Sequence, residues 1–299
     1  MLKRSVFTLA LAAATVAALT GCAAGSSSAD GKVRVVASTN VYGDIASTIA
    51  GNAVDVTALM TDPAQDPHSF EASAQSQLAV SKADILIENG GGYDDFMDTL
   101  RTGSKNTKAT VLNVVDISGK KAVGGELNEH VWYDFPTVQK FTTALTDALS
   151  KADPSQKATF AANARAFSAK LAALQNREAE LKATYAGEGV AVTEPVPLYL
   201  LEASGLVNKT PEKFSAAIEA GTDVSPLVLQ QTLALFSAHK VRLLAYNEQT
   251  SGPETDRVRA AATAAGIPVV PVRETLPAGK DYVSWMNANL DAVGAALAR

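Results

Sequence analysis

The chain has little cysteine, few aromatic residues and no basic cluster, and each shortage excludes a class of protein. Cys22 is the only cysteine among 299 residues, so no intramolecular disulfide can form. An aromatic content of 6% argues against stacking surfaces for nucleic acids or sugars, and a formal net charge of −5 argues against nucleic acid as a partner. Beyond the N-terminal region, no apolar run approaches the ~20 residues that span a bilayer.

The N-terminal region itself predicts export and a lipid anchor. Two basic residues precede an apolar run from Val6 to Leu19, which has the length of a signal-peptide core. The run ends in Leu-Thr-Gly-Cys, which resembles a bacterial lipobox; the alternative is an ordinary secretory signal with an incidental cysteine. We therefore predict a signal peptide over 1–21, lipidation of Cys22 on the extracytoplasmic side of the cell membrane, and a flexible tether of small polar residues over 22–32.

After this segment, strands alternate with helices. Short apolar runs rich in β-branched residues predict strands over 33–38, 54–60, 84–88 and 109–114, and again over 190–193, 241–246 and 267–272. Helical patterns lie between them, over 44–49, 73–81 and 93–101, and later over 198–204, 225–239, 254–265 and 282–297. This alternation is typical of parallel sheets covered by helices, in which functional loops follow the carboxyl ends of the strands.

The middle of the chain has almost no strand character. Residues 136–150 predict one helix, and a second begins at Asp153-Pro154, an N-cap followed by proline, and continues to about Tyr185 without glycine or proline. About 30 helical residues extend ~45 Å. A coiled coil is the alternative, but alanine-rich apolar positions without sustained heptads favour a helix that joins two lobes.

We therefore predict an α/β fold in which two lobes with parallel sheets are joined by one long, rigid helix. The predicted lobes occupy 33–150 and 187–299, and the linking helix lies within 151–186. No segment between them has the composition of a flexible hinge.

Four polar side chains lie where loops of the two lobes would meet. His68 lies in the loop after the strand at 54–60, Glu194 and Glu274 follow two later strands, and His130 precedes a helix. Imidazole is the commonest protein ligand of metals. Two imidazoles and two carboxylates suit a divalent transition-metal ion, and they disfavour Cu(I), which prefers sulfur, and Ca²⁺, which takes only oxygen.

Each of these residues also has a structural interpretation. His68 could cap a helix, His130 could pack on Trp132, Glu194 could cap the helix after Pro195, and Glu274 could be a solvated loop carboxylate. The third histidine, His239, lies near the end of a predicted helix, where a cation complements the helix dipole, and is interpreted as structural.

Several segments resemble a known family. The segments are Asp-Pro-His-Ser-Phe-Glu (66–71), Ser-Lys-Ala-Asp-Ile-Leu-Ile-Glu-Asn-Gly (81–90), Glu-His-Val-Trp-Tyr-Asp (129–134), the stretch from Thr193-Glu194 to Gly205-Leu206, and Glu-Thr-Leu-Pro (274–277). Together they are similar to the cluster A-I substrate-binding lipoproteins of bacterial ABC importers for zinc and manganese, also called the TroA-like or zinc-uptake family. The resemblance covers essentially the whole chain after the tether.

The resemblance implies an extracytoplasmic solute-binding lipoprotein, not an enzyme, that captures Zn²⁺ or Mn²⁺ between its lobes. It implies delivery of the ion to a membrane permease and its ATPase, and a monomeric protein held by lipid on Cys22. The implied metal ligands are His68, His130, Glu194 and Glu274. The third ligand is glutamate instead of histidine and the fourth is glutamate instead of the commoner aspartate, so the resemblance leaves the choice between Zn²⁺ and Mn²⁺ open.

Two other classes of function compete with this interpretation. One is a zinc hydrolase that activates a metal-bound water, although the sequence contains no His-Glu-x-x-His and four protein ligands leave no open position for water. The other is an adhesin or scaffold lipoprotein that functions without metal.

Overall fold

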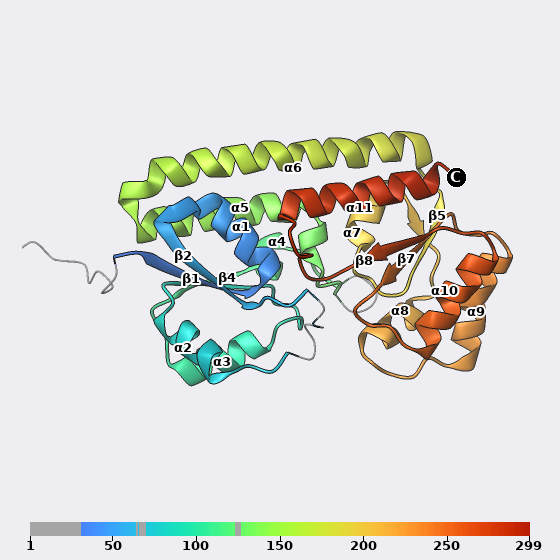
Figure 1. Ribbon diagram of the computed structural model, residues 1–299, viewed down its shortest axis with the longest axis horizontal. Coiled ribbons are helices and arrows are strands. Elements are labelled where there is room, and N and C mark those ends of the chain that lie inside the picture. Colours follow the sequence, from blue (N-terminus) through green and yellow to red (C-terminus); the bar gives the residue numbers. More distant parts are fainter. Residues whose placement is uncertain (1–30, 64, 66–69, 123–126) are drawn as a thin grey trace, which may run out of the picture. The chain divides into compact units, whose positions relative to one another are not determined.

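The computed structural model describes residues 31–63, 65, 70–122 and 127–299 (Figure 1). The predicted signal peptide, Cys22, most of the tether and His68 lie outside the described residues. Lys32–Arg299 forms one compact unit. Among the described residues, no helix combines the length and the apolar character needed to cross a membrane.

The N-terminal lobe contains a parallel sheet with the strand order β2-β1-β3-β4. Its strands are β1 (Val33–Thr39), β2 (Val54–Met60), β3 (Ile85–Glu88) and β4 (Thr110–Asn113). Its helices are α1 (Asn40–Ala50), α2 (Ala74–Lys82), α3 (Phe96–Ser104), α4 (Val114–Ser118) and α5 (Phe135–Ala152). Every residue of β3 is buried, as expected for a parallel strand with helices on both faces.

The C-terminal lobe repeats this plan with the strand order β6-β5-β7-β8. Its strands are β5 (Gly189–Val192), β6 (Val207–Asn208), β7 (Leu244–Asn247) and β8 (Val269–Val272). Its helices are α7 (Leu198–Ala203), α8 (Glu212–Glu219), α9 (Pro226–Ser237), α10 (Pro253–Ala264) and α11 (Tyr282–Leu297). β7 therefore lies between the two strands that precede Glu194 and Glu274.

The long helix α6 (Lys157–Tyr185) connects the lobes and packs against both of them (Figure 1). It contacts α1 and α5 of the first lobe and α7 and α11 of the second. Phe160, Phe167 and Leu171 are buried in a hydrophobic core that includes residues of both lobes. The predicted fold class, two parallel-sheet α/β lobes joined by one long helix, is confirmed.

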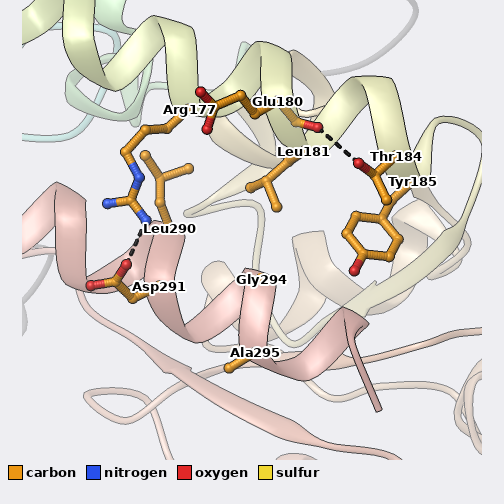
Figure 2. Close-up of a pocket in the computed structure, with 9 residues that line it drawn as sticks. All are labelled: Arg177, Glu180, Leu181, Thr184, Tyr185, Leu290, Asp291, Gly294 and Ala295. Carbon is orange, nitrogen blue, oxygen red and sulfur yellow. Dashed lines mark hydrogen bonds and ion pairs between the residues drawn. The ribbon is translucent and has the colours of Figure 1, made fainter.

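Polar contacts add to this packing along α6 and α11. Arg177 on α6 donates hydrogen bonds to the Asn287 side chain at 2.6 Å and to Asp291 of α11 at 2.5 Å. Figure 2 shows the second contact at one end of a shallow groove between the two helices. A helix held by an apolar core shared with both lobes and by an ion pair to α11 is a stiff connection, because bending it would expose part of that core.

Some elements differ from the sequence-based expectation. α3 begins at Phe96 and not near Tyr93, because Gly90, Gly91 and Gly92 take positive φ angles and form a loop before it. Asp94 accepts hydrogen bonds from the backbone N–H groups of Asn89 and Gly90 and holds that loop closed. The short elements α4, β6 and α8 were not predicted, and α8 proves to carry a residue of the candidate site.

Candidate metal centre

His130 lies immediately before the 3₁₀ turn Val131–Tyr133, with its side chain 1% exposed. Its Nδ1 is 2.8 Å from Asn128 Oδ1, an acceptor, which places the proton on Nδ1 and directs Nε2 into the interior. The ring contacts Trp132 edge-on, at 5.1 Å between centroids, so the packing expected of a structural histidine is present. That packing does not occupy Nε2, which has no hydrogen-bond partner among the described residues.

Carboxylates surround that nitrogen. Glu219 Oε1 lies 3.6 Å and Glu274 Oε2 lies 3.8 Å from His130 Nε2. Both distances exceed those of a hydrogen bond. Two donors that each bind one ion at ~2.1 Å lie about 3–4 Å apart, so these atoms are spaced as the ligands of a shared cation would be.

Glu194 and Glu274 are joined by Asn247, the last residue of β7. Asn247 Nδ2 donates to Glu194 Oε2 at 2.5 Å and to Glu274 Oε1 at 2.8 Å, which it can do because β7 lies between β5 and β8. Thr250 also donates to Glu194 Oε2 at 2.5 Å. Glu194 caps no helix, since α7 has no side-chain cap, and Glu274 is buried, so neither structural alternative describes them.

The segment that carries His130 is fixed to the opposite lobe by hydrogen bonds. Asn128 Nδ2 donates to the Pro195 carbonyl at 3.0 Å, and Tyr199 donates to the Asn128 carbonyl at 2.7 Å. Tyr133 donates to the Arg273 carbonyl at 2.7 Å. The same short segment therefore orients the imidazole and contacts the residues next to both Glu194 and Glu274. Such outer contacts usually determine how well a ligand is oriented.

His68 lies outside the described residues, but Pro63 and Gln65, which precede it, are described. The Gln65 carbonyl accepts a hydrogen bond from Gln249 Nε2 at 2.9 Å, and the Pro63 carbonyl accepts one from Thr275 Oγ1 at 3.0 Å. Gln249 in turn accepts from the Glu274 N–H at 2.6 Å. Pro63 and Gln65, which precede the predicted ligand His68, thus contact the residues around Glu274.

The structure adds two carboxylates that the sequence did not indicate. The ligand atoms of Glu129, His130 and Glu219 all lie within 4.8 Å of one another. Glu129 is adjacent to a predicted ligand and could have been found on that ground. Glu219 ends α8, 25 residues after Glu194, and only the folded chain brings it to His130.

Burial and the charges of neighbouring groups shift the pKa values of His130, Glu194 and Glu219 strongly. Burial raises the pKa of Glu194 to about 7, and the charge of Glu274 adds to this increase. Burial also raises the pKa of Glu219 to about 9, although the charge of His130 opposes the shift. Burial lowers the pKa of His130, but the neighbouring Glu274 and Glu219 outweigh it and raise the value to about 9. These raised pKa values mean that the carboxyl groups retain protons near neutral pH, and a divalent cation would supply the positive charge that lets them ionise together.

The chain is similar in sequence to substrate-binding proteins of metal transporters. The family model described as zinc-uptake complex component A, periplasmic, matches residues 35–296. The manganese ABC transporter substrate-binding lipoprotein ScaA of Streptococcus gordonii is 24% identical over 99% of both chains. The manganese-binding lipoprotein MntA of Bacillus subtilis is 31% identical, but over 50% of this chain and 51% of its own length.

Solved structures show the same fold. The periplasmic zinc-binding protein TroA of Treponema pallidum superposes with a TM-score of 0.75 at 22% identity, covering 90% of this chain and all of its own. The substrate-binding protein FpvC of Pseudomonas aeruginosa, solved with Mn²⁺, gives a TM-score of 0.74 at 20% identity and covers 89% of this chain and 98% of its own.

Proposed function

Because the chain belongs to the family of zinc-uptake complex component A, the substrate-binding proteins of metal ABC importers, we propose that His68, His130, Glu194 and Glu274 bind its cargo, a Zn²⁺ or Mn²⁺ ion. Members of this family are binding proteins and not enzymes, and an importer implies a permease and an ATPase as partners. The observation that carries the ligand assignment is the buried Nε2 of His130, which faces carboxylates at metal-sharing distances.

The donor set fits capture of an ion better than it fits catalysis. A catalytic zinc site keeps one coordination position open for water, whereas histidines and carboxylates from both lobes would fill the positions here. The comparisons give the hydrolase alternative no support. A laminin-binding adhesin of Streptococcus agalactiae shares the fold, with a TM-score of 0.72 at 20% identity.

Elemental analysis of the protein purified without added metal tests this function. We expect close to one equivalent of Zn²⁺ or Mn²⁺ per chain, and we expect a metal-stripped sample to take up one equivalent of either ion. The bound ion should give no hydrolytic turnover of ester or peptide substrates. A protein that carries no metal and takes up neither ion at stoichiometric concentration would contradict the proposal.

We also propose that the protein acts as a monomer anchored through lipid on Cys22. Replacing Cys22 by alanine removes the acylated sulfur, so the variant should move from the membrane fraction to the soluble extracytoplasmic fraction. Ser26→Ala, in the same predicted tether, serves as the control and should stay with the membrane. Fractionation followed by immunoblotting measures the distribution. Membrane retention of the Cys22 variant would refute the anchor.

A further inference from the structure

Glu219 is the residue of this site that the family resemblance did not supply. It is the last residue of α8, its side chain is 15% exposed, and its Oε1 is fully buried 3.6 Å from His130 Nε2. That oxygen has no hydrogen-bond partner among the described residues. A buried carboxylate oxygen without a partner costs free energy, and such a group needs an explanation.

A structural role explains Glu219 poorly. The C-terminal end of a helix carries a partial negative charge, which makes it an unfavourable place for an anion. The contact with His130 is too long for a hydrogen bond, and His130 already faces Glu274. His130 Nε2 and Glu219 Oε1 therefore lie 3.6 Å apart, and neither atom has a hydrogen-bond partner among the described residues.

We propose that Glu219 is an additional oxygen ligand of the bound ion, contributed by α8 of the C-terminal lobe. This inference rests on the proposed function, because it assumes an ion held by His130 and Glu274. A further carboxylate would make the donor set richer in oxygen and raise the coordination number above four. Oxygen-rich sites of high coordination number suit Mn²⁺, whereas Zn²⁺ prefers a tetrahedral set with nitrogen or sulfur. Glu219 would thus favour Mn²⁺ relative to Zn²⁺.

The test compares Glu219→Gln with a matched control on the same helix. The amide keeps the size of the side chain but removes its charge and one acceptor oxygen. Glu212→Gln changes an exposed residue of α8 in the same way and should bind both ions like the wild type. Affinities for Mn²⁺ and Zn²⁺ are measured separately by competition with a chelating dye. We expect Glu219→Gln to lose at least ~10-fold in affinity for Mn²⁺ and clearly less for Zn²⁺.

Substitution with Co²⁺ gives a second readout that reports on the ligands directly. The visible absorption of Co²⁺ is weak in five- or six-coordinate sites and strong in tetrahedral ones. We expect weak bands in the wild type and stronger bands in Glu219→Gln, because one ligand is lost. A variant with an unchanged Mn²⁺-to-Zn²⁺ ratio and an unchanged Co²⁺ spectrum would overturn the proposal, even if its thermal stability changed.

Failure of this proposal can be told apart from failure of the proposed function. If the wild type binds neither ion, the function itself fails and Glu219 has no ion to bind. If the wild type binds metal and His130→Ala does not, while Glu219→Gln behaves as the wild type, only the role of Glu219 is refuted. Loss of Mn²⁺ affinity in Glu219→Gln with Glu212→Gln unaffected supports it.

Discussion

Replacing His130 by alanine is expected to weaken binding of Zn²⁺ or Mn²⁺ by roughly 60- to 700-fold. A structural site with four ligands is worth ~10–16 kcal/mol, so one ligand contributes roughly 2.5–4 kcal/mol, and each 1.4 kcal/mol is about tenfold in affinity. The substitution also removes the imidazole that lies within 4 Å of both Glu219 and Glu274. Any repulsion left between these carboxylates destabilises the metal-free protein and is relieved when an ion binds, so it lessens the loss of affinity.

Isothermal titration of metal-stripped protein measures this loss. His239→Asn is the matched control, because His239 is exposed beyond the end of α9 and takes a positive φ of 48°, which asparagine tolerates. The control should retain wild-type affinity. Since His130 is fully buried, a thermal melt of the metal-free variant checks that it folds, and His130→Gln offers a polar replacement if alanine does not. Wild-type affinity in a folded His130 variant would contradict the ligand assignment.

Elements with a regular apolar pattern were predicted well from the sequence. The strand over 54–60 and the helix over 282–297 match β2 and α11 at both ends. In each element, the apolar side chains recur with the period of a strand or of a helix and pack into the core. Burial of these side chains therefore accounts for both the sequence pattern and the observed element. The apolar pattern predicts a strand over 241–246, whereas β7 spans Leu244–Asn247. The chain just before it already meets β5, since the Leu243 carbonyl accepts a hydrogen bond from the Ala191 N–H at 3.0 Å.

The residues that complete the site were harder to predict, because they depend on sheet order and on short elements. Asn247 binds both Glu194 and Glu274, yet an asparagine after an apolar run also fits a turn, and only the position of β7 between β5 and β8 gives it this role. Glu219 belongs to an eight-residue helix whose pattern is too short to be distinctive. Position next to a predicted element made His130, Glu194 and Glu274 candidates but left their structural roles open, and the family resemblance singled them out. In the fold, Asn247 joins Glu194 to Glu274, and Glu274 lies 3.8 Å from His130 Nε2.

The stability of the metal-free protein should depend on pH through Glu178, a buried residue of α6. Its side chain is 5% exposed, and Oε1 has no hydrogen-bond partner among the described residues. Burial, reinforced by the charge of Asp134, raises the pKa of Glu178 to about 8 from an ordinary value of 4.5. The other titratable group that its charge affects is Tyr282 of α11, whose hydroxyl donates to the Trp132 carbonyl at 2.6 Å.

The direction of the effect follows from where the proton is bound. Below about pH 4.5 the carboxyl is protonated in both the folded and the unfolded state, and its contribution to stability is fully present. Between about pH 4.5 and pH 8 the unfolded chain releases the proton while the folded protein retains it, so the free energy of unfolding falls as pH rises. Above that range the folded protein must hold a buried, ionised carboxylate. The loss is on the order of 5 kcal/mol.

Glu178→Gln should remove this loss, because an amide of the same size stays neutral at every pH. Differential scanning calorimetry of metal-free samples should give equal Tm values for variant and wild type near pH 4.5, and a variant Tm higher by ~10–15 °C at pH 8.5. Glu180→Gln, two residues further along α6 and exposed, should show no such divergence. The contributions of Glu194 and Glu219, which titrate in the same range, are common to all three proteins and cancel in the comparison. A constant difference in Tm between Glu178→Gln and the wild type across this range would show that Glu178 ionises normally, with its carboxylate solvated or paired in the folded protein.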